Sequence, residues 1–169
     1  PYFSASKIRW LLTHNNDVQQ ALAENELAFG TIDSFLLWRL TSGQAHATDT
    51  TNASRTLLLN IQSLGWDQEL LQLFGVPEHI LPQVRQSADR YGVCDTRLFG
   101  LALPVLALVG DQQAAALGQG CISAGSLKST YGTGCFALVN TGCSPLFSRH
   151  RLLTNVAFTV QGQTFYALE

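Results

Sequence analysis

The chain has 169 residues, enough for one domain or two small ones, and 46% of them are hydrophobic, so a core can form. A net charge of −2 gives no electrostatic attraction to nucleic acid or to an anionic membrane, and no basic run is interleaved with aromatic residues. Only 13% of the residues are charged, against roughly 25% in ordinary soluble domains, so we expect part of the surface to contact other protein.

The cysteines and the apolar runs narrow the class of protein further. No apolar run reaches the roughly 18 residues of a membrane span. The four cysteines form no Cys-x-x-Cys pair and no histidine stands at zinc-ligand spacing, so we expect buried, reduced thiols, a cytoplasmic location and no metal held by the protein. All four histidines lie in polar contexts and are interpreted as surface residues. Because the chain lacks Met and starts at Pro1, we expect an internal fragment of a longer protein.

Helices dominate the elements predicted for the first part of the chain. The spacing of Ile8 and Leu11 predicts a helix over 7–14, and Asp17 is the expected cap of a second helix over 18–24. The other elements expected before residue 103 are a helix capped by Asp33 that ends at Leu40 with Phe35, Leu36 and Leu40 inward, an irregular Thr-rich segment over 44–56, a helix from Asp67 to Phe74 and a helical turn over 77–82. The stretch over 83–100 is polar and loop-like, with a short strand around 91–93 as its alternative.

The pattern changes after residue 103. The apolar run over 103–109 is typical of a buried strand, and the Ala-rich run over 112–119 predicts a helix. After Gly125 the period becomes two, which predicts strands over 126–131, 135–140, 155–160 and 164–168 with a hairpin turn at 161–163. We therefore expect a domain boundary between residues 118 and 119.

A single carboxylate follows the apolar strand, in the sequence Gly110-Asp111-Gln112-Gln113. In open α/β sheets, ligands bind beyond the carboxyl ends of the strands. Asp111 is therefore a candidate general base or metal ligand, and the alternative is that it only caps the following helix. Gln112 and Gln113 are candidates to bind a polyol hydroxyl, or they are ordinary amides on the surface of a helix.

About twenty residues later comes the turn Gly132-Thr133-Gly134. Glycines let backbone N–H groups approach phosphate oxygens and a Thr hydroxyl adds a donor, although a plain hairpin turn has the same composition. A carboxylate followed by such a turn suggests phosphoryl transfer. Arg55 is a second candidate anion ligand, with a structural pairing to Asp49 as its alternative.

Five segments, in this order, resemble the FGGY family of carbohydrate kinases. The Gln pair after Asp111 and the Cys-Phe pair after Gly134 look like the glycerol-phosphorylating members rather than the pentulose kinases. The segments are Pro1-Tyr2-Phe3-Ser4, Phe29-Gly30-Thr31-Ile32-Asp33, Thr51-Asn52-Ala53-Ser54-Arg55-Thr56, Gly110-Asp111-Gln112-Gln113-Ala114-Ala115 and Thr130-Tyr131-Gly132-Thr133-Gly134-Cys135-Phe136.

The resemblance implies an α/β chain with the actin-like ATPase fold, in which two ribonuclease-H-like domains enclose the site. Residues 1–118 would be the C-terminal part of the N-terminal, substrate-binding domain, and residues 119–169 would be the start of the C-terminal, nucleotide-binding domain. The implied reaction is phosphorylation of glycerol by ATP with Mg²⁺. By motif match, Asp111 is the catalytic base, the substrate contacts are Tyr2, Asp111, Gln112 and Phe136, and the nucleotide contacts are Gly132 and Thr133.

Two alternatives remain open at this point. One is a related FGGY sugar or polyol kinase, and the other is a non-catalytic actin-like module that binds nucleotide. The family's N-terminal phosphate loop and adenosine-binding segment are not in these 169 residues, so we expect this chain alone to be inactive. The resemblance also implies that the longer parent is a homo-oligomer. Residues 93–102 lack the Gly-rich, basic character expected of a fructose 1,6-bisphosphate loop, which makes that inhibition doubtful.

Overall fold

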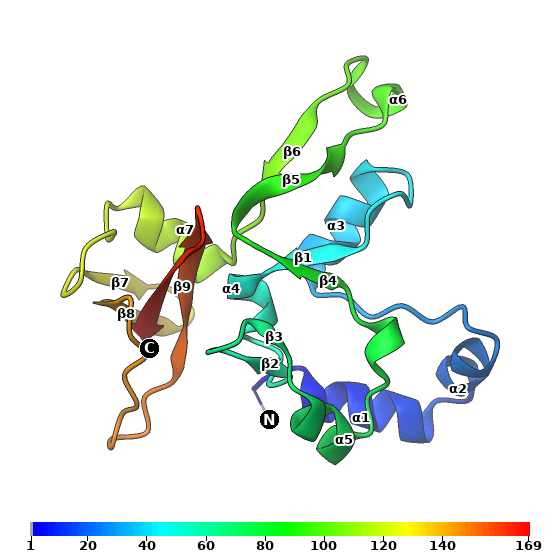
Figure 1. Ribbon diagram of the computed structural model, residues 1–169, viewed down its shortest axis with the longest axis horizontal. Coiled ribbons are helices and arrows are strands. Elements are labelled where there is room, and N and C mark those ends of the chain that lie inside the picture. The colour runs from blue at the N-terminus through cyan, green and yellow to red at the C-terminus, as the bar shows by residue number, and fades with distance from the viewer. Residues whose placement is uncertain (1) are drawn as a thin grey trace.

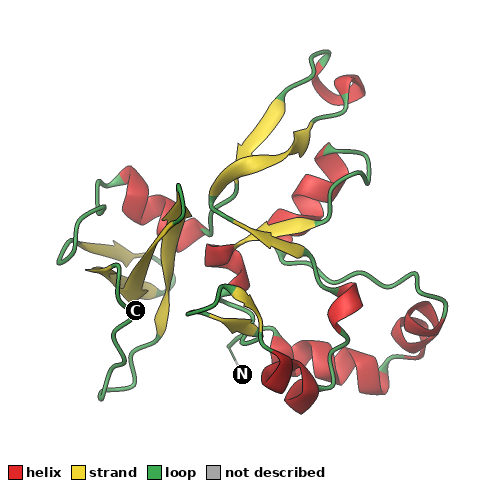
Figure 2. Cartoon of the chain, in the orientation of Figure 1, coloured by secondary structure: helices red, strands yellow, loops and turns green. Residues whose placement is uncertain are grey.

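A computed structural model describes residues 2–169 of the chain (Figure 1). Helices and short strands make up the earlier part of the chain, and the last elements form one antiparallel sheet (Figure 2). Three separate clusters of buried apolar side chains hold these parts together.

The first cluster lies between helices near the N-terminus. The predicted helices are confirmed here as α1 (Ala5–His14), α2 (Asn16–Ala23) and α5 (Gln68–Phe74), with a 3₁₀ turn η1 (Glu78–Ile80) and the paired strands β2 (Leu59–Asn60) and β3 (Gly65–Trp66). Asp67 caps α5 as predicted, because its carboxylate accepts from the N–H groups of Glu69 and Leu70. The cap of α2 is Asn15 rather than Asp17, since the Asn15 amide oxygen accepts from Val18 N at 3.1 Å.

The second cluster joins α3 (Ile32–Leu40) to β1 (Ala47–Asp49) through Leu37, Ala47 and Tyr91. Strand β1 pairs parallel with β4 (Gln83–Arg85). The predicted inward face of α3 is wrong, since Phe35 is 56% and Leu36 is 51% exposed whereas Leu37 is fully buried. Asp33 does not cap this helix either. Its carboxylate is buried and accepts hydrogen bonds from the hydroxyls of Thr31 and Thr48, so it ties α3 to β1.

The Thr-rich segment over 44–56 is not irregular, as the sequence predicted, but is ordered and largely buried. It contains β1 and the short helix α4 (Thr50–Ala53). The carboxylate of Asp49, at the end of β1, accepts from the N–H groups of Thr51 and Asn52 and so begins α4. The hydroxyl and amide groups of this segment bond to the carboxylates of Asp33 and Asp49 and to Thr159, which is why its polar composition is compatible with burial.

The stretch over 83–100 is also more ordered than a loop, and the strand considered around 91–93 is present. It forms β4, β5 (Ala88–Val93) and the short helix α6 (Thr96–Phe99). The predicted strand over 103–109 is present but shorter, as β6 (Pro104–Ala107), and it pairs antiparallel with β5. It was predicted to be buried, yet most of it is exposed on a two-stranded ribbon that lies beside α3 (Figure 1).

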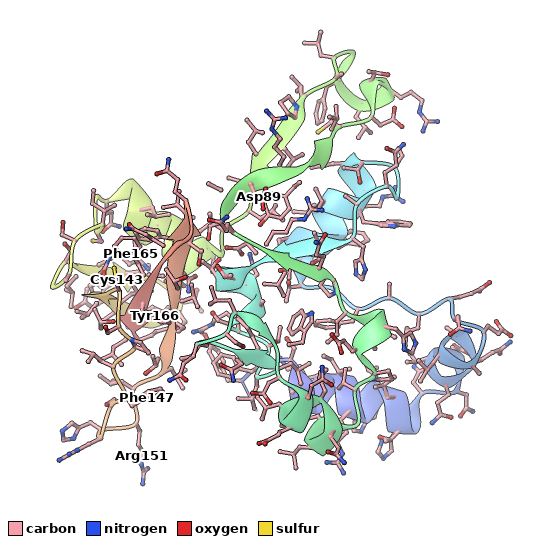
Figure 3. The ribbon with its side chains drawn as sticks, viewed as in Figure 1. Asp89, Cys143, Phe147, Arg151, Phe165 and Tyr166 are labelled. Carbon is pink, nitrogen blue, oxygen red and sulfur yellow. The ribbon has the colours of Figure 1, made fainter. Side chains whose placement is uncertain are left out.

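The third cluster holds α7 (Asp111–Gly118) against the last sheet. This sheet confirms the four strands predicted from the period-two pattern: β7 (Leu127–Tyr131), β8 (Cys135–Gly142), β9 (Thr154–Val160) and β10 (Gln163–Leu168), in the order β7-β8-β10-β9. The predicted hairpin turn between β9 and β10 is confirmed, with positive φ at Gln161 and Gly162. The long connection between β8 and β9 carries Phe147 and Arg151 and extends away from the sheet (Figure 3).

Two further expectations are only partly met. Cys94 and Cys121 are buried free thiols, but Cys135 and Cys143 are exposed. His46 is not a plain surface residue, because it is half-buried and its ring nitrogen Nε2 lies 2.7 Å from the carbonyl oxygen of Phe29. Within residues 2–169, no helix is long and apolar enough to cross a membrane.

Candidate active site

The turn that carries Asp111 is fixed by a buried carboxylate elsewhere in the chain. The N–H of Gly110 donates to Oγ1 of Thr51 at 2.8 Å, and the same hydroxyl donates to the carboxylate of Asp49 at 2.8 Å. Burial raises the pKa of the Asp49 carboxyl, and hydrogen bonds from Asn52, Ser87 and Thr51 act in the opposite direction. The strand end before Asp111 is thus anchored to α4 rather than free to move as a loop.

Gly110 packs closely against the side chain of Gln113 at this turn. A Cβ at Gly110 would stand 2.7 Å from Oε1 of Gln113 and 3.6 Å from Oγ1 of Thr51. A side chain here would therefore displace the amide end of Gln113, whereas its distance from Thr51 is an ordinary contact.

The Asp111 side chain opens α7 and is exposed to solvent. Its Oδ1 accepts from the N–H of Gln112 at 2.8 Å, while Oδ2 has only the Gln112 Nε2 at 3.5 Å beside it. Only two ion pairs form among residues 2–169, and Asp111 belongs to neither. The carboxylate therefore keeps a free oxygen that can accept a proton from a substrate.

The two glutamines after Asp111 have different surroundings. Gln113 is 3% exposed, and its amide nitrogen donates to Oδ1 of Asn155 at 3.4 Å and to the carbonyl of Val156 at 3.5 Å. It therefore joins α7 to β9. Gln112 is half-buried, and its Oε1 accepts from the ammonium group of Lys128 on β7. Of the pair, Gln112 is the one that lies beside the carboxylate of Asp111.

The turn at Gly132-Thr133-Gly134 joins β7 to β8 and is exposed, so the Thr133 hydroxyl is open to a ligand. The N–H of Gly132 bonds across the turn to the carbonyl of Gly134 at 3.0 Å. A Cβ at Gly134 would stand 2.8 Å from Cε2 of Phe136, so the glycine makes room for that half-buried ring. The structure thus allows both interpretations of this turn, a hairpin and a phosphate contact.

The remaining predicted substrate contact, Tyr2, lies beside Arg55. Its hydroxyl accepts from Nη2 of Arg55 at 2.9 Å, and the guanidinium carbon lies 5.0 Å from the centroids of both the Tyr2 and Phe3 rings. Arg55 forms an ion pair with Glu169 on the other side, and not with Asp49 as one interpretation of the sequence had it. No hydrogen bond joins Tyr2 directly to Asp111 in the described part of the chain.

Sequence reasoning missed Lys128 and Glu169 as neighbours of the predicted site. Lys128 stands inside an alternating strand pattern at a position that faces the core, and a charged residue at such a position is the one local indication of a special role. Glu169 contacts a residue 114 positions away, which local patterns do not reveal. Across residues 2–169, no group of three or more His, Cys, Asp or Glu side chains is placed to hold a metal ion.

Solved structures resemble this arrangement closely. The crystal structure of Plasmodium falciparum glycerol kinase with ADP matches 99% of this chain with a TM-score of 0.92 and 35% identity, and the match covers 34% of that chain. A xylulose kinase from Rhodospirillum rubrum matches 98% of this chain and 33% of its own, with a TM-score of 0.79, but at 21% identity the likeness concerns the fold alone. The chain is therefore an α/β protein with the actin-like ATPase fold, as expected from the sequence. Residues 1–118 match the N-terminal domain of the FGGY family of carbohydrate kinases, and the chain belongs to this family.

Curated relatives agree with this assignment. A glycerol kinase of Rhodospirillum centenum is 60% identical over 169 residues, which is 100% of this chain and 34% of that protein. A glycerol kinase of Rhizobium meliloti is 54% identical, with the same coverage of both chains. The chain thus spans about a third of the length of the curated relatives it matches.

Proposed function

We propose that the whole polypeptide to which these residues belong is an ATP-dependent glycerol kinase that forms sn-glycerol 3-phosphate. One observation carries this proposal: the exposed carboxylate of Asp111 stands beside the amide of Gln112 on an anchored turn. The relatives named glycerol kinase, at 60% and 54% identity, support the choice of substrate.

The proposed chemistry starts at the free carboxylate oxygen of Asp111. It accepts the proton of the terminal glycerol hydroxyl while that oxygen attacks the γ-phosphorus of ATP. The bond between the γ-phosphorus and the bridging oxygen breaks, and ADP leaves with the electron pair. Gln112 and the Tyr2 hydroxyl are the proposed polar contacts to glycerol, and the ring of Phe136 is its proposed apolar contact.

The nucleotide contacts are proposed for the turn between β7 and β8. Gly132 and Thr133 would contact the phosphates, Gly132 by letting the backbone approach closely and Thr133 through its hydroxyl, and the solved neighbour with ADP supports nucleotide use. Mg²⁺ would arrive with ATP as part of the substrate. Such an ion is typically bound by substrate phosphates and several waters.

We also propose a division of the chain that follows its change of architecture. Residues 1–118 would belong to the substrate-binding domain and residues 119–169 to the start of the nucleotide-binding domain, because the antiparallel sheet begins after α7. The complete enzyme is proposed to be a cytoplasmic homo-oligomer. These 169 residues alone are expected to give no glycerol-dependent release of ADP.

The test measures glycerol-dependent release of ADP by the complete polypeptide and by its Asp111→Asn variant. The substitution keeps the oxygen that accepts from Gln112 but removes the base, so kcat is expected to fall roughly 10²- to 10⁴-fold with the fold intact. Asp17→Asn is the matched control, since Asp17 is exposed on α2. An Asp111→Asn variant with unaltered kcat would overturn the assignment of the base.

The same assay separates the alternative functions. Faster turnover of xylulose or gluconate than of glycerol would identify a related sugar kinase, whose fold the neighbours at 18% to 21% identity share. Nucleotide binding without transfer to any polyol would identify a non-catalytic module. Either result would contradict the proposed glycerol kinase activity.

A further inference from the structure

Lys128 is a buried cation next to the proposed site. Its side chain projects from β7, is 1% exposed, and donates to Oε1 of Gln112. None of the carboxylates in the described chain forms an ion pair with it. Because a buried ammonium group without a carboxylate partner is costly, its presence here needs a reason other than stability.

The chemistry of the ammonium group fixes the orientation of the Gln112 amide. A lysine has three donors and no acceptor, so only the Oε1 side of the amide can face Lys128. The other side of the amide, Nε2, then lies 3.5 Å from Oδ2 of Asp111. A flipped amide would turn its NH₂ group toward the ammonium and its oxygen toward the carboxylate, and both contacts would be repulsive.

We propose that Lys128 is a positioning residue, which locks Gln112 so that its N–H donors face Asp111 and the hydroxyl of the acceptor substrate. The inference depends on the proposed function, because it assigns a task to Gln112 in that reaction. A hydroxyl in this place accepts from the Gln112 amide through a lone pair and donates its own proton to Asp111. The locked amide therefore orients the hydroxyl for loss of its proton to the base.

A merely structural role for Lys128 makes different predictions. If Lys128 served stability alone, its replacement by a residue of similar length would change the melting temperature and leave the KM for glycerol unaltered. If Lys128 positions Gln112, its replacement would instead raise the KM for glycerol. The melting temperature need not fall, because replacing a buried charge by an apolar side chain is often neutral or stabilising for the fold. The two roles can therefore be separated by measuring kinetics and melting temperature on the same variants.

The experiment compares Lys128→Met, Gln112→Ala and the double variant in the complete polypeptide. For Lys128→Met we expect a KM for glycerol raised about tenfold, a KM for ATP unchanged, and a melting temperature equal to or above that of the parent. In the Gln112→Ala background, Lys128→Met should add no further change in KM, since the residue acts through Gln112. Arg90→Met is the matched control, because Arg90 is exposed on β5.

A second variant keeps the test decisive if Lys128→Met does not fold. Gln112→Glu preserves an acceptor for Lys128 and adds the missing carboxylate, but it removes the donor that faces the substrate. It should therefore fold and still show a raised KM for glycerol. An unaltered KM in Lys128→Met or in Gln112→Glu, or additive effects in the double variant, would overturn the proposal. A parent protein that does not phosphorylate glycerol at all would instead refute the proposed function.

Discussion

Gly110 and Thr51 are joined by a hydrogen bond of 2.8 Å although they stand 59 positions apart in the sequence. The Thr51 hydroxyl accepts from the Gly110 N–H and donates to the buried Asp49 carboxylate. One side chain thus connects the end of β1 to the turn that carries Asp111. The Thr-rich segment, which looks like an ordinary loop in the sequence, holds the candidate base in place.

Thr51→Val tests this connection. Valine has nearly the same shape but no acceptor, so the Gly110 N–H would lose its partner at a site where Thr51 is fully buried. We expect a loss of about 1–3 kcal/mol in the free energy of unfolding, measured by urea denaturation, together with a reduced kcat. Thr96→Val on the exposed helix α6 is the control. A stable variant with an unchanged kcat would show that the turn does not depend on Thr51.

The fold was predicted best where local chemistry decides it. The Asp67 cap, the Gln161-Gly162 turn and the alternating pattern after Gly125 all gave correct elements, because each is determined by near neighbours in sequence. The inward face of α3 was wrong because Leu37 is the side chain that packs against β1, and Phe35 and Leu36 then point to the more exposed side of the helix. The segment over 44–56 was predicted to be irregular because its composition could not reveal that the Asp49 carboxylate accepts from the N–H groups of Thr51 and Asn52.

The site was predicted unevenly for the same reason. Asp111 and Gln112 are adjacent in sequence, and their juxtaposition in space follows directly from the strand-to-helix turn. The bonds from Lys128 to Gln112 and from Arg55 to Glu169 join separate elements of the chain. Such long-range pairings depend on the sheet register and on packing, which a single sequence does not specify.

Arg55→Lys tests whether the guanidinium group positions Tyr2. The two terminal nitrogens of Arg55, Nη1 and Nη2, donate to the carboxylate of Glu169, and Nη2 also donates to the Tyr2 hydroxyl at 2.9 Å. The single ammonium group of lysine cannot reproduce this geometry. We expect the KM for glycerol to rise several-fold and the free energy of unfolding to fall by about 1–3 kcal/mol. Steady-state kinetics and urea denaturation of the complete polypeptide measure the two effects.

The control for this substitution is Arg149→Lys, since Arg149 is exposed on the connection between β8 and β9. Tyr2→Phe in the Arg55→Lys background should change the KM little further, because the hydroxyl has already lost its donor. Fully independent effects of the two substitutions would refute the coupling.

The cap of α5 predicts a pH dependence of stability. Hydrogen bonds from the N–H of Leu70 and the side chain of Asn60 hold the pKa of Asp67 below its usual range. The folded state therefore favours the charged form, and its contribution to stability is present above the unfolded pKa of about 3.9 and is lost as the pH falls below it. Melting temperatures across pH 2–7 should show a smaller decline at low pH for Asp67→Asn than for the parent. The same decline in both proteins would contradict this role of the charge.

Gly134→Ala tests the room that the turn leaves for Phe136. The added Cβ would stand 2.8 Å from Cε2 of the ring, so the ring must move away from its present position. Because Phe136 is the proposed apolar contact of glycerol, we expect a raised KM for glycerol, with the KM for ATP also affected if the turn shifts. Gly118→Ala is the matched control, since its Cβ would meet nothing within 4 Å and alanine favours the helix there. Unaltered kinetics in Gly134→Ala would remove Phe136 from the proposed glycerol contacts, and equal losses in both variants would point to a general effect on folding.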